Sequence, residues 1–144
     1  MNTIRHILQL KGDFVWSISP DATVFEAIRM MADKRAGALV VLDGEHMVGI
    51  ISERDYARKV ILQGKSSKET KVSEIMTAKV FTVHPDQTVE EAMDLMVKHH
   101  IRHLPVVQDT AVVGVISIMD TTRNVIYSMR QTIRDLEDKM LSSK

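Results

Sequence analysis

The chain has 144 residues, and its 19 Lys and Arg residues balance 19 Asp and Glu residues to a formal net charge of zero. This balance argues against a nucleic-acid-binding protein, because such proteins gain most of their affinity from cations that contact phosphates. The chain has no cysteine, which excludes a disulfide framework, a thiolate metal site and a catalytic thiol.

A short helix is expected at the N-terminus, because Ile4, Ile7 and Leu8 lie at helical spacing before Gly12. Neither this segment nor any other has the apolar run of about 18 residues that a membrane span needs. The polar residues of the N-terminal segment also argue against a signal peptide. The predicted location is therefore the cytoplasm, with no membrane partner.

The segment that follows is the first copy of an internal repeat. Residues 17–55 realign without a gap on residues 82–120 at a constant shift of 65 positions. In the first copy the expected elements are a strand at 15–18, a helix with its apolar stripe over 24–31, and strands at 38–42 and 47–51 joined by Asp43-Gly44. The second copy repeats them with a helical stripe over 89–96 and strands at 104–107 and 112–117.

Each copy is too short to bury a good core alone, so the two are expected to pack into one globule about a pseudo-twofold axis. The fold class is therefore α+β, with two β-α-β-β-α repeats, an N-terminal helix and a long C-terminal helix. We assign residues 12–65 to the first repeat and residues 72–125 to the second. The connection between them is rich in Gly, Ser and Lys, which predicts an exposed loop.

The last predicted element is an amphipathic helix over residues 126–144. Its apolar residues alternate at spacings of three and four, as in the seam of a coiled coil. The residues of this seam are Ile126, Met129, Ile133, Leu136 and Met140. Either the seam covers the helix's own domain, or it meets a second chain, and the second alternative predicts a homodimer.

Both repeats contain the motif Gly-Φ-Φ-Ser-x-x-Asp, in which Φ is aliphatic, at the end of a strand. Ser52 and Asp55 occupy the motif in the first repeat, and Ser117 and Asp120 occupy it in the second. A helix that begins there offers unpaired N–H groups to a phosphate, and an ionised aspartate can accept hydrogen bonds from ribose hydroxyls. The alternative is a capping box, in which the serine and the acid satisfy only the helix's own amides. The occurrence of the motif at the same place in both repeats favours a ligand site.

These motifs resemble those of the tandem cystathionine-β-synthase (CBS) domain proteins. The resemblance rests on the combination of Gly-Ile-Ile-Ser-Glu-Arg-Asp at 49–55, Gly-Val-Ile-Ser-Ile-Met-Asp at 114–120, Ile-Arg-His-Leu-Pro-Val-Val at 101–107 and Glu-Ile-Met-Thr at 74–77. It covers about residues 12–122. Family membership implies two clefts, each built across both repeats, that bind adenine nucleotides.

Carried over residue by residue, the resemblance implies the composition of both clefts. The first cleft would contain Ser52, Arg54, Asp55, His84, Ile101, Arg102 and His103. The second would contain Ser117, Asp120, Ser19, Ala36, Gly37 and Ala38. Since Met119 stands where the first repeat has Arg54, the second cleft is expected to carry less positive charge.

The function implied by the resemblance is that of a stand-alone regulatory module that senses energy or cofactor state. AMP is the first expected ligand, with ADP, ATP, NAD and S-adenosylmethionine as the others, and the target protein stays unspecified. No constellation of nucleophile, base and orienting group is present, so no enzymatic activity and no catalytic cofactor are expected. A metal site is not expected either, although His99 and His103 are four residues apart. The alternatives are an interaction protein without a ligand and a nucleic-acid-binding protein that uses the basic stretch between residues 54 and 71.

Overall fold

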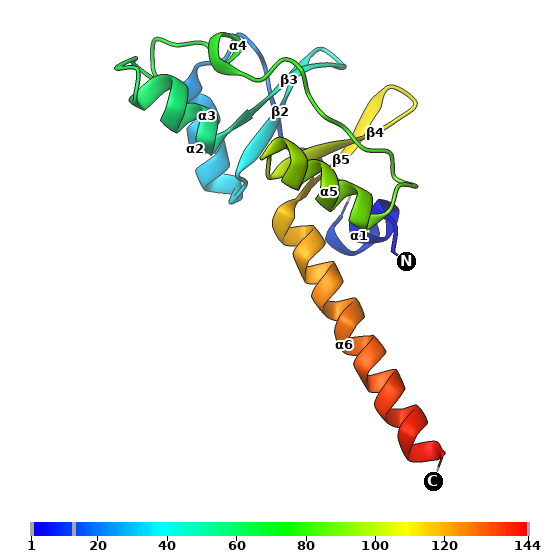
Figure 1. Ribbon diagram of the computed structural model, residues 1–144. Helices are drawn as coiled ribbons and strands as arrows, with labels where there is room; N and C mark the ends of the chain where they lie inside the picture. Colours follow the sequence, from blue (N-terminus) through cyan, green and yellow to red (C-terminus); the bar gives the residue numbers. More distant parts are fainter. Residues whose placement is uncertain (1, 13, 144) are drawn as a thin grey trace.

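The computed structural model describes residues 2–12 and 14–143 (Figure 1). Its elements in chain order are α1 (Ile4–Lys11), β1 (Ser17–Ile18), α2 (Val24–Lys34), β2 (Ala38–Asp43), β3 (His46–Ser52), α3 (Glu53–Tyr56), the π-helical turn η1 (Ala57–Ile61), α4 (Val72–Ile75), α5 (Val89–His99), β4 (His103–Gln108), β5 (Ala111–Ser117) and α6 (Ile118–Ser142). The fold is α+β, as the sequence predicts. No helix among the described residues is long and apolar enough to cross a membrane.

The two repeats form separate small sheets. In the first, β1 pairs in parallel with β2, and β2 pairs antiparallel with β3. In the second, β4 and β5 form an antiparallel hairpin, and a single parallel bridge from Val83 to Val106 stands where the first repeat has β1. Both predicted hairpins are confirmed. Gly44 closes the first with a φ of 64°, a backbone conformation that glycine adopts without strain.

The helices α2 and α5 occupy the same position in the two repeats and begin in the same way. Thr23 and Thr88 cap them by accepting hydrogen bonds from the backbone N–H groups of Glu26 and Glu91, both at 3.1 Å. Such a cap satisfies an N–H group that has no partner within the helix. Each helix then buries one apolar face on its sheet, and these two faces begin the two hydrophobic cores.

Each core is completed by a helix that precedes the other repeat in the chain. Ile4, Ile7 and Leu8 of α1 are buried in the core of the second repeat. Val72 and Ile75 of α4 are buried in the core of the first repeat. Although α1 lies outside the repeated unit in sequence, it belongs to the second repeat in space. The residues of one repeat therefore form only part of each core, and the helix that precedes the other repeat supplies the rest.

The long helix α6 runs without interruption from the end of β5 to Ser142. The expected division at residue 126 therefore falls inside one helix. The first two turns of α6 pack on the second repeat through Ile118, the buried Thr121 and Val125. Figure 1 shows the remainder of the helix extending away from both repeats.

The exchanged helices approach the sheets so closely that only glycine fits beneath them. A Cβ atom on Gly114 would lie 2.6 Å from Cδ2 of Leu8. We expect Gly114→Ala to lower the free energy of unfolding by about 1–3 kcal/mol, because overpacking forces neighbouring atoms apart. The cost should be much smaller in a Leu8→Ala background, which removes the clashing atoms. Urea unfolding of the four proteins measures both effects, and an equal cost in the two backgrounds would contradict this packing.

Candidate functional site

Each Ser-x-x-Asp motif forms a capping box at the start of a helix. The Ser52 N–H donates to Oδ2 of Asp55 at 2.9 Å, and the Asp55 N–H donates to Ser52 Oγ at 3.2 Å. In the second repeat the Ser117 N–H donates to Oδ2 of Asp120 at 2.8 Å, and the Asp120 N–H donates to Ser117 Oγ at 3.2 Å. The capping geometry holds each carboxylate in one orientation at a strand end. The capping-box hydrogen bonds use Oδ2 of each aspartate and do not involve Oδ1.

Asp55 lies on the wall of a cavity of about 760 Å³ between the two repeats. The β3–α3 turn provides one side through Ser52, Arg54 and Asp55, and the segment before β4 provides the opposite side. A third side comes from the chain that follows α4, between Thr77 and Phe81. This volume is within the range of about 300–1,000 Å³ that small-molecule sites occupy.

The cavity is rich in positive charge, although the chain as a whole is neutral. Its cationic lining residues are Arg54, Arg58, Lys59, Lys79 and Arg102, and its acidic ones are Glu53 and Asp55. Cations gathered in a cleft raise the local concentration of anionic ligands. The cavity is therefore suited to a ligand that carries a phosphate.

Two of these cations already link separate parts of the site. Nη1 of Arg54 donates to the carbonyl oxygen of His100 at 3.2 Å, so it crosses from one repeat to the other. Nζ of Lys59 lies 3.1 Å from Oδ1 of Asp55 and donates to the carbonyl oxygen of Ile75 at 2.9 Å. A ligand hydroxyl that binds Asp55 would share the carboxylate with this ammonium group.

The lining of the cavity also includes flat side chains. The rings of Phe81 and His99 are stacked, with centroids 3.8 Å apart and planes 17° apart. His103 packs against Gly37, where a Cβ atom would lie 3.0 Å from the imidazole. Burial, together with the charges of Lys11 and Arg102, lowers the pKa of His103, and the charge of Asp120 opposes them only in part. His103 is therefore neutral at pH 7 and offers an uncharged ring.

The structure brings together six of the seven residues expected in the first cleft. They are Ser52, Arg54, Asp55, Ile101, Arg102 and His103. His84 is the exception, because it is exposed and its Nδ1 accepts a hydrogen bond from the Asp86 N–H at 3.1 Å. Gly37 and Ala38, expected in the second cleft, also line this cavity. Ser19 and Ala36 line neither this cavity nor the one beside Asp120.

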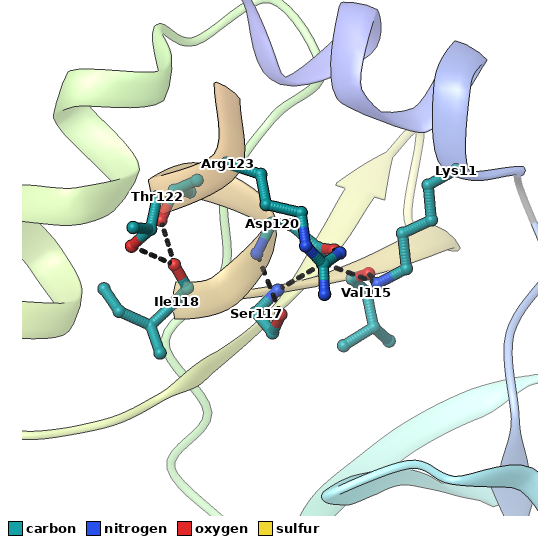
Figure 2. A network of polar contacts seen from close by, with 8 residues as sticks. Lys11, Val115, Ser117, Ile118, Asp120, Thr122 and Arg123 are labelled. Atoms are coloured by element: carbon teal, nitrogen blue, oxygen red, sulfur yellow. Dashed lines mark hydrogen bonds and ion pairs between the residues drawn. The ribbon is translucent and has the colours of Figure 1, made fainter. Parts of the chain in front are cut away.

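The surroundings of Asp120 differ from those of Asp55. Figure 2 shows Lys11 reaching from the last turn of α1 to the carboxylate, with Nζ 2.6 Å from Oδ2 of Asp120 and 2.7 Å from the carbonyl oxygen of Val115. Nη1 of Arg123 lies 3.7 Å from Oδ1 of the same aspartate. The cavity at Asp120 measures about 390 Å³ and is lined by α1 and α6 rather than by residues 36–38. The lining of this cavity has two cations and one carboxylate, against five cations and two carboxylates around Asp55, so it is the less positive of the two, as expected.

This difference follows from the lengths of the two exchanged helices. The chain leaves α4 after Ile75, and Thr77 forms a two-hydrogen-bond bridge with Ile50 on β3. The helix α1 is four residues longer than α4, spanning 8 residues against 4, so its last turn extends along the sheet edge. The ammonium group of Lys11 then bonds the Val115 carbonyl, which is the counterpart of Ile50. The first site is bordered by extended chain and the second by a helix.

Lys11 also controls the protonation of Asp120. Burial raises the pKa of Asp120, but the Lys11 hydrogen bond and charge and the Ser117 hydrogen bonds together lower it below the usual value of 3.8. A depressed carboxyl pKa contributes stability that is complete above the unfolded pKa and is lost as the pH falls through the folded one.

We expect Lys11→Met to lower the free energy of unfolding at pH 7 by about 1–3 kcal/mol, because a half-buried carboxylate loses a charged hydrogen-bond donor. The difference between variant and wild type should shrink as the pH falls below about 4, where Asp120 of the variant takes up a proton. Urea unfolding from pH 3 to pH 7 measures it. A difference that does not change with pH would show that Lys11 acts through packing alone.

Several lining residues are absent from the clefts that the resemblance implies, including Lys11, Thr77, Lys79 and Phe81. Lys11 is the last residue of α1 and the others lie in the chain after α4, both outside the aligned repeat, so the shift of 65 positions gives no signal for them. No group of three or more His, Asp or Glu residues with metal-binding geometry is present in 2–12 and 14–143. His99 instead stacks on Phe81, as described above.

Comparison with known families gives a match over both repeats. The model described as "CBS domain" matches residues 12–61 and again residues 72–127. Among curated proteins, the mitochondrial CBS domain-containing protein CBSX3 of Arabidopsis thaliana is 41% identical over 144 residues, covering 93% of this chain and 69% of its own.

Two solved structures show the same fold. A protein with CBS domains from Burkholderia ambifaria MC40-6 is 46% identical with a TM-score of 0.85, covering 88% of this chain and 95% of its own. The CBS domain pair of protein MJ0100 is 28% identical with a TM-score of 0.80, covering 89% of this chain and 98% of its own. That pair was solved in complex with 5′-methylthioadenosine and S-adenosyl-L-methionine.

Proposed function

The chain belongs to the CBS-domain family, and from this premise we propose that it is a non-catalytic regulatory module that binds an adenine nucleotide in the cavity beside Asp55. The observation that carries the proposal is the cavity itself. It combines a carboxylate oriented by a capping box with five cationic side chains and a stacked pair of rings. MJ0100, which shares the fold, binds two adenosine compounds.

Each part of the cavity has a proposed role. Asp55 accepts hydrogen bonds from the ribose hydroxyls, because an ionised carboxylate accepts through both oxygens. Arg54 and Arg102 neutralise the phosphate from opposite repeats, since guanidinium groups suit phosphate geometry. The base lies against the apolar part of the wall near Ile101 and the neutral ring of His103. A nucleotide bound in this way would hold the two repeats together.

AMP is the proposed ligand because its one ribose matches the single Asp55 carboxylate and its one phosphate matches the cluster of cations. ADP, ATP, NAD and S-adenosylmethionine contain the same adenosine and are the competing ligands. The chain would signal through the association of this module with a target protein, and a homodimer is the proposed assembly.

Thermal unfolding in the presence of each nucleotide tests the proposal. A ligand that binds only the native state stabilises it by about 2.7 kcal/mol at 100 times its Kd. AMP should raise the melting temperature most among AMP, ADP, ATP, NAD and S-adenosylmethionine, whereas GMP at the same concentration should give a much smaller shift. No shift with any adenine compound would leave the capping boxes as helix caps only, the role that an interaction protein without a ligand requires.

A further inference from the structure

The second half of α6 exposes an apolar face that nothing in the single chain covers. Every residue from Thr132 to Ser143 is exposed. The seam residues Ile133, Leu136 and Met140 are among them, while Ile126 and Met129 are more than two-fifths exposed on the turns before. A helix segment without tertiary contacts is marginally stable in water, since most helix stability in proteins comes from packing of the apolar face. A long helix with such a face is therefore expected to have a partner.

We propose that this face binds the same face of α6 from a second copy of the chain, with the two helices antiparallel. The proposal deepens the homodimer suggested above, on which it rests, and names its surface. The segment from Ile126 to Ser142 is about 25 Å long at 1.5 Å per residue.

The antiparallel register follows from the positions of the seam residues. When Met129 lies opposite Met140 of the second copy, Ile133 lies opposite Leu136 of that copy, and the twofold axis repeats both contacts. These four layers are then entirely apolar, and Ile126, at each end of the interface, lies opposite Ser143 of the second copy. The same register places Arg130 beside Glu137 of the second copy, and again the axis repeats the pair. Opposite charges that flank a coiled-coil seam determine partner choice and orientation.

A parallel arrangement lacks this charge complementarity. In it Arg130 would lie beside Val125 of the second copy, and Glu137 would lie beside Thr132. Neither neighbour carries a charge, so the parallel pair would gain nothing from the two ionic side chains. The sequence of α6 thus favours the antiparallel arrangement.

Two matched leucines on α6 test whether the face is covered. Leu136 is on the seam and 56% exposed in the single chain, whereas Leu141 is off the seam and 68% exposed. Since both are open in one chain, Leu136→Glu and Leu141→Glu should leave the fold equally unaffected. Leu136→Glu should weaken dimerisation at least tenfold by light scattering over a concentration series, and Leu141→Glu should leave it unchanged. Equal behaviour of the two variants would overturn the proposal.

The absence of cysteine from the chain allows a direct test of orientation. Met129→Cys mixed with Met140→Cys should form an intermolecular disulfide under mild oxidation, while neither variant alone should do so. In the antiparallel register, two copies of residue 129 lie about 16 Å apart along the helix axis, well beyond the Cα separation of a disulfide. Disulfide formation in each variant alone would show a parallel pair, and none in the mixture would show no seam; either result overturns the proposal.

Nucleotide binding by the same variants separates this proposal from the proposed function. The seam residues do not line the Asp55 cavity. Calorimetry with AMP on Leu136→Glu should therefore give the wild-type affinity while light scattering detects the monomer. If the wild-type protein did not bind AMP, the proposed function would be contradicted. The light-scattering comparison of Leu136→Glu with Leu141→Glu would still test the α6 interface.

Discussion

Asp55→Ala is expected to weaken the binding of AMP by at least tenfold and to leave the fold intact. Of the two carboxylates that line the cavity, Asp55 is the one that a capping box holds in a fixed orientation, and it can accept hydrogen bonds from both ribose hydroxyls. A hydrogen bond to a charged group contributes about 1.5–3 kcal/mol, and 1.4 kcal/mol corresponds to a tenfold change in Kd. Isothermal titration calorimetry measures the change directly.

Asp120→Ala is the matched control, because Asp120 closes the same capping box in the other repeat. Both variants lose the carboxylate of a capping box, so loss of helix stability alone would affect them alike. Only Asp55→Ala should reduce AMP affinity at the 760 Å³ cavity. If the two variants bound AMP equally well, the Asp55 carboxylate would have no part in ligand binding.

The second large effect concerns the phosphate. Arg54→Met should remove most of the preference for AMP over adenosine, because the guanidinium group lines the cavity and can bind the phosphate. We expect the ratio of the two affinities to fall about tenfold or more, which corresponds to one charged hydrogen bond. Adenosine serves as the internal control, since its binding reports whether the cavity is still formed.

Arg29→Met provides the comparison variant, because Arg29 is exposed on α2 and does not line the cavity. Its AMP-to-adenosine ratio should equal that of the wild type. The same ratio in Arg54→Met would show that Arg54 serves only to link the repeats through its hydrogen bond to His100.

The repeat in the sequence predicted most of the fold because its periodicity reports burial. The apolar stripes of α2 and α5 and both hairpins follow from spacing and turn residues alone. The exchange of α1 and α4 between repeats could not be predicted in this way. It depends on which core has room for Ile4 or Val72, and that room is set by packing between segments far apart in the chain.

The candidate site was predictable where the motif itself supplies the residues. The Ser-x-x-Asp turns and the segment before β4 are adjacent to strands, so their positions follow from the strands. His84 and Ser19 were placed in the clefts through the resemblance, and both are exposed at turns that lie outside the Asp55 cavity. The contact between Lys11 and Asp120 depends on the length of α1, which residue spacing before Gly12 did not define closely enough.

Calorimetric titration of the wild-type protein with AMP and with adenosine is the most direct test of nucleotide binding at the Asp55 cavity. We predict that AMP binds with a Kd at least ten times lower than that of adenosine, since the cations of the Asp55 cavity attract the phosphate. The preference should weaken as salt is added, because screening reduces the attraction. Absence of binding heat at several temperatures with AMP, ADP, ATP, NAD and S-adenosylmethionine, or equal affinity for AMP and adenosine, would contradict it.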